Sequence, residues 1–551
     1  MRTLILWVGA LLLCCAGAHA QYHIAENKVW ALGGGGLVNF NSGTPVGGTS
    51  SLSTLEGNAS VCNAMGGLLF YTDGKTVYTH TGSIMPSGSA IVPYDVSSTT
   101  QAAAIVPFIN DTSKYYIFSL AYESIGAYTM CHLFYSVVDM TLNGGLGDIM
   151  PDSAGIELAD SLSEKMTTVA GNDCNVWLIV HRSDTSLFHV FNVTPGGISG
   201  PDTYNTGFFS TPYGMATYGN GYHLGAMKCS PDRSKLFLTC LLAFYTPPIR
   251  GAGELYDFDP ATGAVSNCRE MTNNLAHHYC EFSANSSKLY AFNVDSSAIF
   301  QYDLSLPSTA AQIASKKKIT GTYSVYGDMR LGPDGKIYIS QMGDTFLHRI
   351  ADPDAAGLAC NYEHKAVNIA PGFVSLGMPN MVWKVHGVGS EITGPAEVCA
   401  GDSITLLSSV PGAIWTSSAP AVATIDFSSG KVYGISAGTV TITYAMGEGG
   451  CAITKDIIVK ECETKVPHTT ASADVHIYPL PAGNTVTIHC PSATKGWYLN
   501  MYDMTGRPVL HATLRQQTTT IDMGGIPPGI YNCSLHDSEG HIQARKMIVR
   551  R

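Results

Sequence analysis

The chain is poor in charged residues, which make up 13% of its 551 residues, and acidic residues outnumber basic ones. The formal net charge of −11 argues against a nucleic-acid partner, because proteins that bind phosphate backbones present a basic surface. No Cys-x-x-Cys pair is present, which disfavours a zinc ribbon and a thioredoxin-like redox site. Beyond the N-terminus, no apolar run is long enough to span a bilayer.

The N-terminus has the pattern of a secretory signal peptide. Arg2 supplies a positive charge, residues 4–16 form an apolar run, and residues 18–20 (AHA) form a small-x-small cleavage site. The apolar run is shorter than the ~20 residues of a membrane-spanning helix. We therefore expect residues 1–20 to be removed, so that the mature, exported chain begins at Gln21.

Composition favours several all-β domains. The chain is long for a single core, and 58 glycines accompany many β-branched and aromatic residues, which suit strands and tight turns. Of the 15 cysteines, Cys14 and Cys15 lie in the signal peptide, so 13 remain in the exported chain. An oxidising compartment favours disulfides among these, and the odd number leaves at least one free.

Residues 21–387 repeat one pattern: an apolar strand, a polar turn, and an aromatic-rich strand. The plainest copies are residues 227–238 (MKCSPDRSKLFL), 280–291 (CEFSANSSKLYA) and 329–339 (MRLGPDGKIYI). Their turns begin at Ser230, Ser283 and Gly332, which are 53 and 49 residues apart. Units of this size that must stack to bury their faces are typical of a β-propeller.

We expect about seven blades in this propeller. Six units are readable, and a seventh could form if residues 29–40 paired with residues 379–386, which would close the ring and remove its edges. An array of β-sandwiches is the alternative.

The same region resembles the N-terminal propeller of Bacteroidetes surface proteins, which are often called gliding-motility-associated or type IX sorting proteins. The phrases that carry the resemblance are 30–40 (WALGGGGLVNF), 52–57 (LSTLEG), 68–74 (LLFYTDG), 105–107 (IVP), 326–335 (YGDMRLGPDG), 352–362 (DPDAAGLACNY) and 377–380 (GMPN). The resemblance implies a surface location but no chemistry at any residue.

Residues 388–460 have the short alternating strands of an Ig-like sandwich. Residues 434–442 (GISAGTVTI) resemble the signature of bacterial Ig-like domains, group 2. Cys399 and Cys451 lie near the first and last strands, and we predict that they pair. The same stretch fits the Gly-x-Ser-x-Gly elbow of esterases, but strand-like residues flank it on both sides, so we interpret Ser436 as a turn residue.

After a polar linker at 461–473, residues 474–551 resemble the type A C-terminal sorting domain of the type IX secretion system. Three phrases and the chain end carry this: 475–484 (VHIYPLPAGN), 499–509 (LNMYDMTGRPV), 521–531 (IDMGGIPPGIY) and 546–549 (KMIV). The motif residues are Tyr478, Pro479, Pro481, Tyr502, Asp503, Gly506, Gly529, Tyr531 and Lys546. The resemblance implies a β-sandwich that the secretion machinery recognises, removal by a sortase-like peptidase, and attachment of the new C-terminus to lipopolysaccharide.

No catalytic residue, cofactor or metal site is predicted. Asp257 and Asp259 form an Asp-x-Asp pair that could hold calcium, but their sequence context favours a turn cap. The candidate ligand-binding residues are His223, His277, His278 and Tyr326, which precede or begin inner strands where a propeller gathers side chains at one mouth of its channel. Histidines in a solvated loop are the plainer interpretation.

The leading hypothesis is a cell-surface binding or adhesion protein whose propeller presents a glycan or a host or matrix protein ligand. The alternatives are a surface glycan lyase or hydrolase with its site at the propeller mouth, and a structural spacer. A pair of carboxylates at that mouth would favour the enzyme. Separately, Ser153, Ser161 and Ser403 follow aspartates in a short pattern typical of O-glycosylation in Bacteroidetes envelopes, and we expect them on exposed loops.

Overall fold

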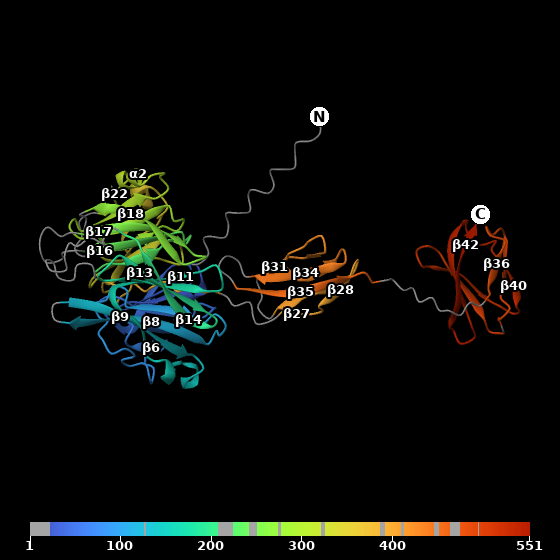
Figure 1. Ribbon diagram of the computed structural model, residues 1–551, viewed down its shortest axis with the longest axis horizontal. Coiled ribbons are helices and arrows are strands. Elements are labelled where there is room, and N and C mark those ends of the chain that lie inside the picture. The colour runs from blue at the N-terminus through green and yellow to red at the C-terminus, as the bar shows by residue number, and fades with distance from the viewer. Residues whose placement is uncertain are drawn as a thin grey trace, which may run out of the picture. The chain divides into compact units, whose positions relative to one another are not determined.

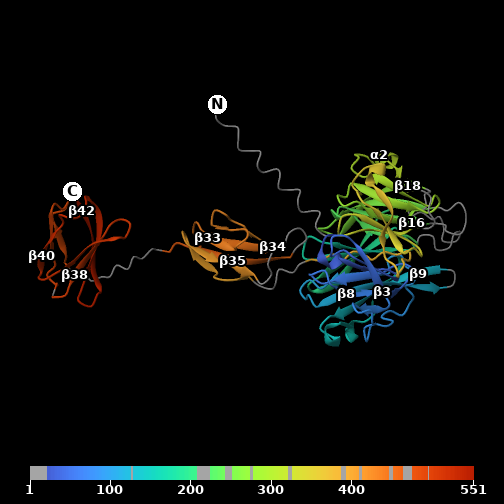
Figure 2. The same cartoon turned by 180° about the vertical axis from the view of Figure 1, so that it is seen from behind.

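The computed structural model describes residues 22–125, 128–207, 224–241, 251–273, 277–320, 326–385, 392–408, 413–445, 451–462, 474–493 and 495–551. The chain divides into two compact units, Met1–Lys460 and Glu461–Arg551. Figure 1 shows that the regular elements are nearly all strands, with only short helices among them, and Figure 2 shows the same arrangement from behind. The predicted signal peptide lies outside the described residues. None of the described helices has the length and apolar character that a membrane crossing requires.

The first unit begins with two three-stranded antiparallel sheets, which are the first two blades of a propeller. Their strands are β1 (Val29–Ala31), β2 (Gly34–Asn39) and β3 (Val46–Ser53), then β4 (Ala59–Cys62), β5 (Leu68–Thr72) and β6 (Val77–Thr79). The one-turn helix η1 (Ala25–Asn27) precedes them.

Blades three and four share one long strand and so form a single eight-stranded sheet. The strands are β7 (Ala103–Pro107), β8 (Lys114–Ile125), β9 (Tyr128–Asp139), β10 (Asp148–Ile149), β11 (Ile156–Ala170), β12 (Val176–Arg182), β13 (Leu187–Thr194) and β14 (Gly197–Asn205). The first half of β11 pairs with β9 as an outer strand, and its second half pairs with β12 as an inner strand. The change occurs around Leu162, next to Ser161, whose φ of 55° marks an irregularity in the ladder.

Three four-stranded sheets complete the ring as blades five to seven. Their strands are β15 (Met227–Cys229), β16 (Lys235–Leu241), β17 (Gly251–Asp259) and β18 (Ala264–Asn273); β19 (His277–Phe282), β20 (Lys288–Asn293), β21 (Ala298–Asp303) and β22 (Lys317–Lys318); and β23 (Tyr326–Leu331), β24 (Ile337–Gln341), β25 (Phe346–Ile350) and β26 (Tyr362–Asn368). The short helix α2 (Thr309–Ala314) links β21 to β22. The described residues therefore form seven blades, which confirms the propeller.

The three repeats found in the sequence are the first hairpins of these three blades. In each turn the fourth residue has a positive φ: 61° at Arg233, 62° at Ser286 and 76° at Gly335. Its N–H donates to the carbonyl of the first turn residue at 2.8–2.9 Å. The repeated turn chemistry thus sets the hairpin geometry in all three copies.

The ring closes differently from the prediction. Residues 379–386 were expected to pair with residues 29–40, and His386 lies outside the described residues. Pro379 forms an isolated bridge with Asn58 in place of a ladder. The side chain of Asn27 donates to the carbonyl of Val382 at 3.0 Å and accepts its N–H at 3.0 Å. A side-chain amide therefore replaces part of the expected ladder.

Residues 392–460 form an Ig-like sandwich. Its strands are β27 (Ile392–Thr393), β28 (Glu397–Cys399), β29 (Ser403–Thr405), β30 (Leu407–Ser408), β31 (Ile414–Ser417), β32 (Ala423–Ile425), β33 (Lys431–Gly434), β34 (Gly438–Ala445) and β35 (Ala452–Lys460). Alternate residues of β34 are buried, as in a strand with one face on a core. Ser436 lies in the turn between β33 and β34 and donates to the carbonyl of Ala421, which confirms the turn and excludes a strand-to-helix elbow there.

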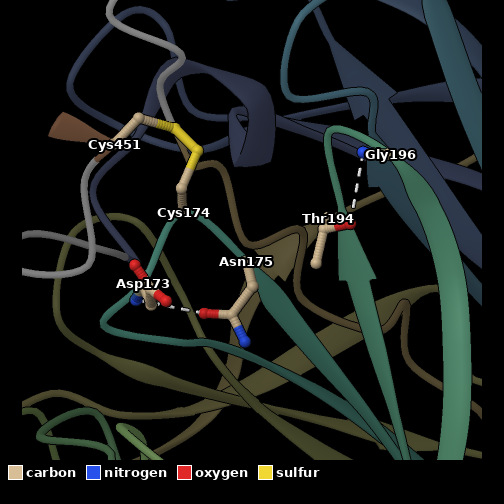
Figure 3. The surroundings of a disulfide bond; sticks show 6 residues. All are labelled: Asp173, Cys174, Asn175, Thr194, Gly196 and Cys451. Carbon is tan, nitrogen blue, oxygen red and sulfur yellow. Dashed lines mark hydrogen bonds between the residues drawn. A yellow bond between two sulfur atoms is a disulfide. The ribbon is translucent and has the colours of Figure 1, made fainter. Parts of the chain in front are cut away.

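The predicted Cys399–Cys451 disulfide is wrong. Cys451 is bonded to Cys174, in the hairpin between β11 and β12 (Figure 3). Cys399 is opposite Lys460, nine residues along β35 from Cys451, a separation of roughly 30 Å in an extended strand. Cys399 and Cys462 are each disulfide-bonded as well.

The second unit is a compact β-sandwich of two sheets. One contains β36 (His476–Tyr478), β37 (Thr485–His489) and β40 (Thr518–Asp522); the other contains β38 (Tyr498–Tyr502), β39 (Pro508–Thr513), β41 (Gly529–His536) and β42 (Ile542–Arg550). Its core includes Val486, Ile488, Met501 and Ile548, which are fully buried. The unit therefore has a hydrophobic core of its own.

Candidate functional site

Polar side chains gather where the inner strands of the propeller surround its axis. Glu164 lies on β11, Tyr279 on β19 and Asp328 on β23, while Glu56 precedes β4. All four residues are at most 5% exposed, although such side chains are seldom fully buried without a specific reason. Because they come from four different blades, the propeller ring itself brings them together. We call these four residues the axial site.

The carboxyl group of Glu164 accepts hydrogen bonds from three donors. Its Oε1 accepts the hydroxyl of Thr100 at 2.6 Å and the N–H of Gly225 at 2.7 Å, and its Oε2 accepts the N–H of Thr100 at 3.2 Å. Gly225 has a φ of 134°, and a β-carbon there would lie 2.2 Å from the carbonyl oxygen of Thr239. Glycine at this position therefore lets the backbone approach the carboxylate.

Glu56 is the second buried glutamate of the axial site. Burial raises the pKa of Glu56 well above its usual range, and the nearby charges of Glu164 and Asp328 raise this pKa further. The hydroxyl of Tyr279 donates to Glu56 Oε1 at 3.0 Å. Burial also raises the pKa of Tyr279 well above its usual range, so its hydroxyl keeps its proton. The axial site thus places a carboxyl group that favours its protonated form beside the carboxyl group of Glu164.

Charged residues from the same inner strands form a second layer. Lys228 Nζ lies 3.2 Å from Asp328 Oδ2, and Arg330 Nη1 lies 3.9 Å from Glu281 Oε2. Glu281 also accepts the N–H groups of Phe282 and Leu331. Lys228, Glu281 and Arg330 each stand two residues before a repeated turn, so they occupy equivalent positions on consecutive blades.

A small cavity of about 10 Å³, room for one water molecule, borders this second layer. Its lining includes Lys228, Glu281, Arg330, Asn380, Met381 and Trp383. The Nη2 of Arg330 is buried without a hydrogen-bond acceptor among the residues that the structure describes. Residues 376–385, which we call the closing segment, thus form one wall of the charged layer.

Of the four predicted ligand-binding residues, the structure describes the side chains of His277 and His278 and places them in different surroundings. His278 lies at the axis, with Nε2 3.9 Å from Glu164 Oε1 and its ring 4.1 Å from that of Tyr279. His277 is fully buried, and its ring nitrogens lie 3.2 Å from the Phe292 carbonyl and 3.3 Å from the Tyr302 hydroxyl.

His277 is thus hydrogen-bonded within its own blade, and its part in ligand binding stays a prediction. Burial lowers the pKa of His277 to about 4. His223 lies outside the described residues. Tyr326 begins β23, but its side chain also lies outside them.

Sequence reasoning missed Glu56, Glu164, Tyr279 and Asp328. A signal for the layer beneath was present, because aligning the three repeats places Lys228, Glu281 and Arg330 in one column. No comparable sequence signal marks the axial site, because its four residues do not occupy equivalent positions in the repeats.

The two aspartates of the Asp-x-Asp pair interact with residues of their own blade. Asp257 forms ion pairs with Lys235, at 3.1 Å, and with Arg269. Asp259 accepts the N–H of Ala261 at 3.0 Å and so caps a turn, as its context indicated.

The three predicted glycosylation serines are not all on exposed loops. Ser153 ends the one-turn helix η3 (Pro151–Ser153) and is half-buried, and Ser161 is a half-buried residue of β11. Ser403 is exposed but lies on β29. The prediction of exposed loops is thus wrong for Ser161 and Ser403, which are strand residues, while the modification itself stays a prediction.

In the sorting domain, several predicted motif residues shape turns. Asp503 Oδ1 accepts the N–H groups of Thr505 and Arg507, and Gly506 has a φ of 85° in the same turn between β38 and β39. These hydrogen bonds, led by that from the Thr505 hydroxyl, lower the pKa of Asp503.

The other motif residues are either structural or exposed. The hydroxyl of Tyr531 donates to the Pro527 carbonyl at 2.7 Å, while Tyr478 and Lys546 are exposed. Pro479 and Pro481 follow β36, Tyr502 ends β38, and Gly529 begins β41.

Comparison with known proteins identifies the second unit. Residues 476–550 match the family described as "Secretion system C-terminal sorting domain". No curated protein matches the chain. This domain confirms the sorting assignment: the protein is exported by the type IX secretion system and delivered to the cell surface.

Several solved structures are similar to the chain at low identity. A putative 6-phosphogluconolactonase from Bacteroides fragilis has 13% identity and a TM-score of 0.32, covering 72% of this chain and 92% of that one. PorZ of Porphyromonas gingivalis, a surface component of the type IX secretion system, has 10% identity and a TM-score of 0.23, covering 96% and 81%. The periplasmic gluconolactonase of Pseudomonas aeruginosa has 11% identity and a TM-score of 0.32, covering 72% and 93%. At these values the likenesses carry no argument about activity.

Proposed function

We propose that this surface protein is a binding protein whose propeller takes a small polar ligand, such as a glycan or the exposed group of a host or matrix protein, at the axial site. The observation that carries the proposal is the convergence of Glu56, Glu164, Tyr279 and Asp328 from four blades. A closed ring places such side chains at the end of a channel, where ligands commonly bind.

The charges indicate the class of ligand. Asp328 is balanced by Lys228, and the raised pKa of Glu56 favours its protonated form, which can donate a hydrogen bond. A ligand with hydroxyl or amine groups can donate to the oxygens of Glu164 and accept from Glu56. An anionic ligand would meet three acidic side chains and a single lysine, so sulfated or carboxylated glycans should bind weakly.

The same carboxyl pair favours a second function, a surface glycan hydrolase or lyase. Cleavage of a glycosidic bond by general acid–base catalysis requires two carboxyl groups, one acting as the acid and the other as the base. In that case Glu56→Gln and Glu164→Gln would each abolish release of reducing sugar from neutral polysaccharides. If the protein binds glycans but releases no reducing sugar, the binding function stands and the enzymatic function fails.

We propose that the sorting domain also determines the anchor. Residues 461–473 join the two units, and a sortase-like peptidase would cut within them and join the new C-terminus to lipopolysaccharide. The division of the chain after Lys460 supports this, because cleavage there would leave the core of each unit intact.

A glycan array tests the binding proposal with the mature chain, residues 21–551. The array carries neutral, amine-bearing and anionic sugars. Glu164→Gln should lose the neutral and amine-bearing signals, because the amide can no longer act as a charged acceptor. Glu157→Gln is the matched control, since Glu157 is an exposed residue of the same strand, and it should bind as the wild type does. Equal signals from both variants would refute an axial site.

A further inference from the structure

Two connections join the Ig-like sandwich to the propeller, and both lead to the axial site. The first is the closing segment, residues 376–385, which ends the propeller. The second is the disulfide between Cys174 and Cys451. Trp383 and Val385 of the closing segment belong to a hydrophobic core that also contains Trp415 of the sandwich.

The closing segment is hydrogen-bonded to the backbone that carries the axial site. The carbonyl of Leu376 accepts the N–H of Asp328 at 2.7 Å. The N–H of Asn380 donates to the Asn58 carbonyl at 3.1 Å, and its side chain donates to the Ala103 carbonyl at 2.7 Å. Asn58 is two residues from Glu56, so the position of Asn380 affects the backbone that carries this acid.

Gln101 extends the contact of Asn380 to two more blades. Its Nε2 lies 3.4 Å from Asn380 Oδ1, and its Oε1 accepts the N–H groups of Met166 and Met227 at 3.2 and 2.8 Å. Met166 is two residues from Glu164. Asn380 therefore lies in one hydrogen-bonded group with the backbone next to both glutamates of the axial site.

The disulfide reaches the same strand from its other end. Cys174 lies in the turn that follows β11, and Figure 3 shows its bond to Cys451 beside the hydrogen bond from Asp173 N–H to Asn175 Oδ1, which is 3.2 Å long. The side chain of Asn175 also donates to Asn192 Oδ1 at 2.8 Å, which ties the turn to the neighbouring strand β13. The sandwich is thus covalently attached to the hairpin that carries Glu164.

We propose that the Ig-like sandwich positions the floor of the axial site, with the Cys174–Cys451 bond as a thiol-sensitive clamp on the closing segment. This inference rests on the proposed function of the axial site. With the bond closed, the sandwich is restrained at both connections, so Asn380 keeps its hydrogen bonds to the backbone next to Glu56 and Glu164. With the bond open, the sandwich loses its covalent restraint on the propeller, and the hydrogen bonds of the closing segment to blades two and three open more often.

The bond opens by thiol–disulfide exchange with a dithiol such as dithiothreitol. The protein disulfide takes up two electrons and two protons and becomes two thiols, while the dithiol becomes a cyclic disulfide. Reoxidation closes the clamp again.

Hydrogen exchange of the mature chain, followed by mass spectrometry, tests the clamp without any ligand. In Cys174→Ser/Cys451→Ser, amides of residues 376–385 and 98–103 should exchange at least tenfold faster, while those of β25 stay unchanged. The matched control is Cys399→Ser/Cys462→Ser, which removes the other disulfide-bonded cysteines and should leave the closing segment protected. Unchanged exchange in the closing segment, or a uniform rise across all blades, would overturn the proposal.

Asn380→Ala provides a second test with both disulfide cysteines present. Removing its side chain should raise exchange at residues 98–103 to the level of the serine double variant, and adding dithiothreitol should raise it little further. A large additional effect of the dithiol would show that the clamp acts elsewhere. If exchange changes as expected but the glycan array shows no ligand, the proposed function fails and the clamp stands.

Discussion

Replacing Glu56 by glutamine removes one of the two buried glutamates of the axial site while keeping its shape. The amide oxygen can still accept the Tyr279 hydroxyl, which lies 3.0 Å from Glu56 Oε1. The variant therefore isolates the effect of the ionisable group, because Tyr279 keeps its partner.

The sign of the effect follows from the raised pKa of Glu56, which burial and the charge of Glu164 cause. The stability that this proton contributes is fully present below the unfolded pKa of 4.5 and is lost as the pH rises through the raised folded pKa. Between these two values the wild type loses about 1.4 kcal/mol of unfolding free energy per pH unit relative to the variant. The unfolding free energy of Glu56→Gln, relative to that of the wild type, should thus rise progressively as the pH rises above 4.5.

Urea unfolding of the mature chain from pH 4.5 to 7.5, followed by tryptophan fluorescence, measures the difference. Glu157→Gln makes the same chemical change at an exposed residue of β11 and should run parallel to the wild type. Parallel curves for Glu56→Gln as well would refute the assignment of a protonated, buried carboxyl at the axis.

Three further predictions concern packing and sorting. Lys228→Met leaves the buried carboxylate of Asp328 without its ion-pair partner. The free energy of unfolding, measured by urea denaturation, should therefore fall by about 3–5 kcal/mol, and adding Asp328→Leu should restore part of this loss. Gly506→Ala forces alanine to a φ of 85° and should lower the stability of the sorting domain by about 1–2 kcal/mol, as measured by thermal unfolding. Gly483→Ala is the control: a β-carbon there meets nothing within 4 Å, so the loss of stability should be smaller. Deleting residues 474–551 should leave the protein folded but in the periplasm, and normal labelling of the deletion at the cell surface would contradict this.

Local signals predicted the parts of the fold that depend on local chemistry. The repeated turns were readable because a Pro-Asp or Ala-Asn step precedes the residue with positive φ, as at Arg233, Ser286 and Gly335. The sorting domain was readable for the same reason, since Asp503 and Gly506 define a turn by themselves.

Features that join distant parts of the chain were not predictable. Cys174 and Cys451 are 277 residues apart, and nothing in their neighbourhoods indicates a pair. The sharing of β11 between two blades depends on an irregularity at Ser161. The axial site is hidden for the same reason, because Glu56 and Glu164 become neighbours only when the ring closes.

The affinity of the mature chain for the strongest neutral or amine-bearing ligand on the array tests most directly whether the axial site binds that ligand. Isothermal titration at neutral pH should show at least a tenfold weaker binding for Glu164→Gln, and unchanged binding for Glu157→Gln. This result would locate the ligand at the propeller axis. Equal affinities for both variants and the wild type would place the ligand elsewhere and contradict the axial site.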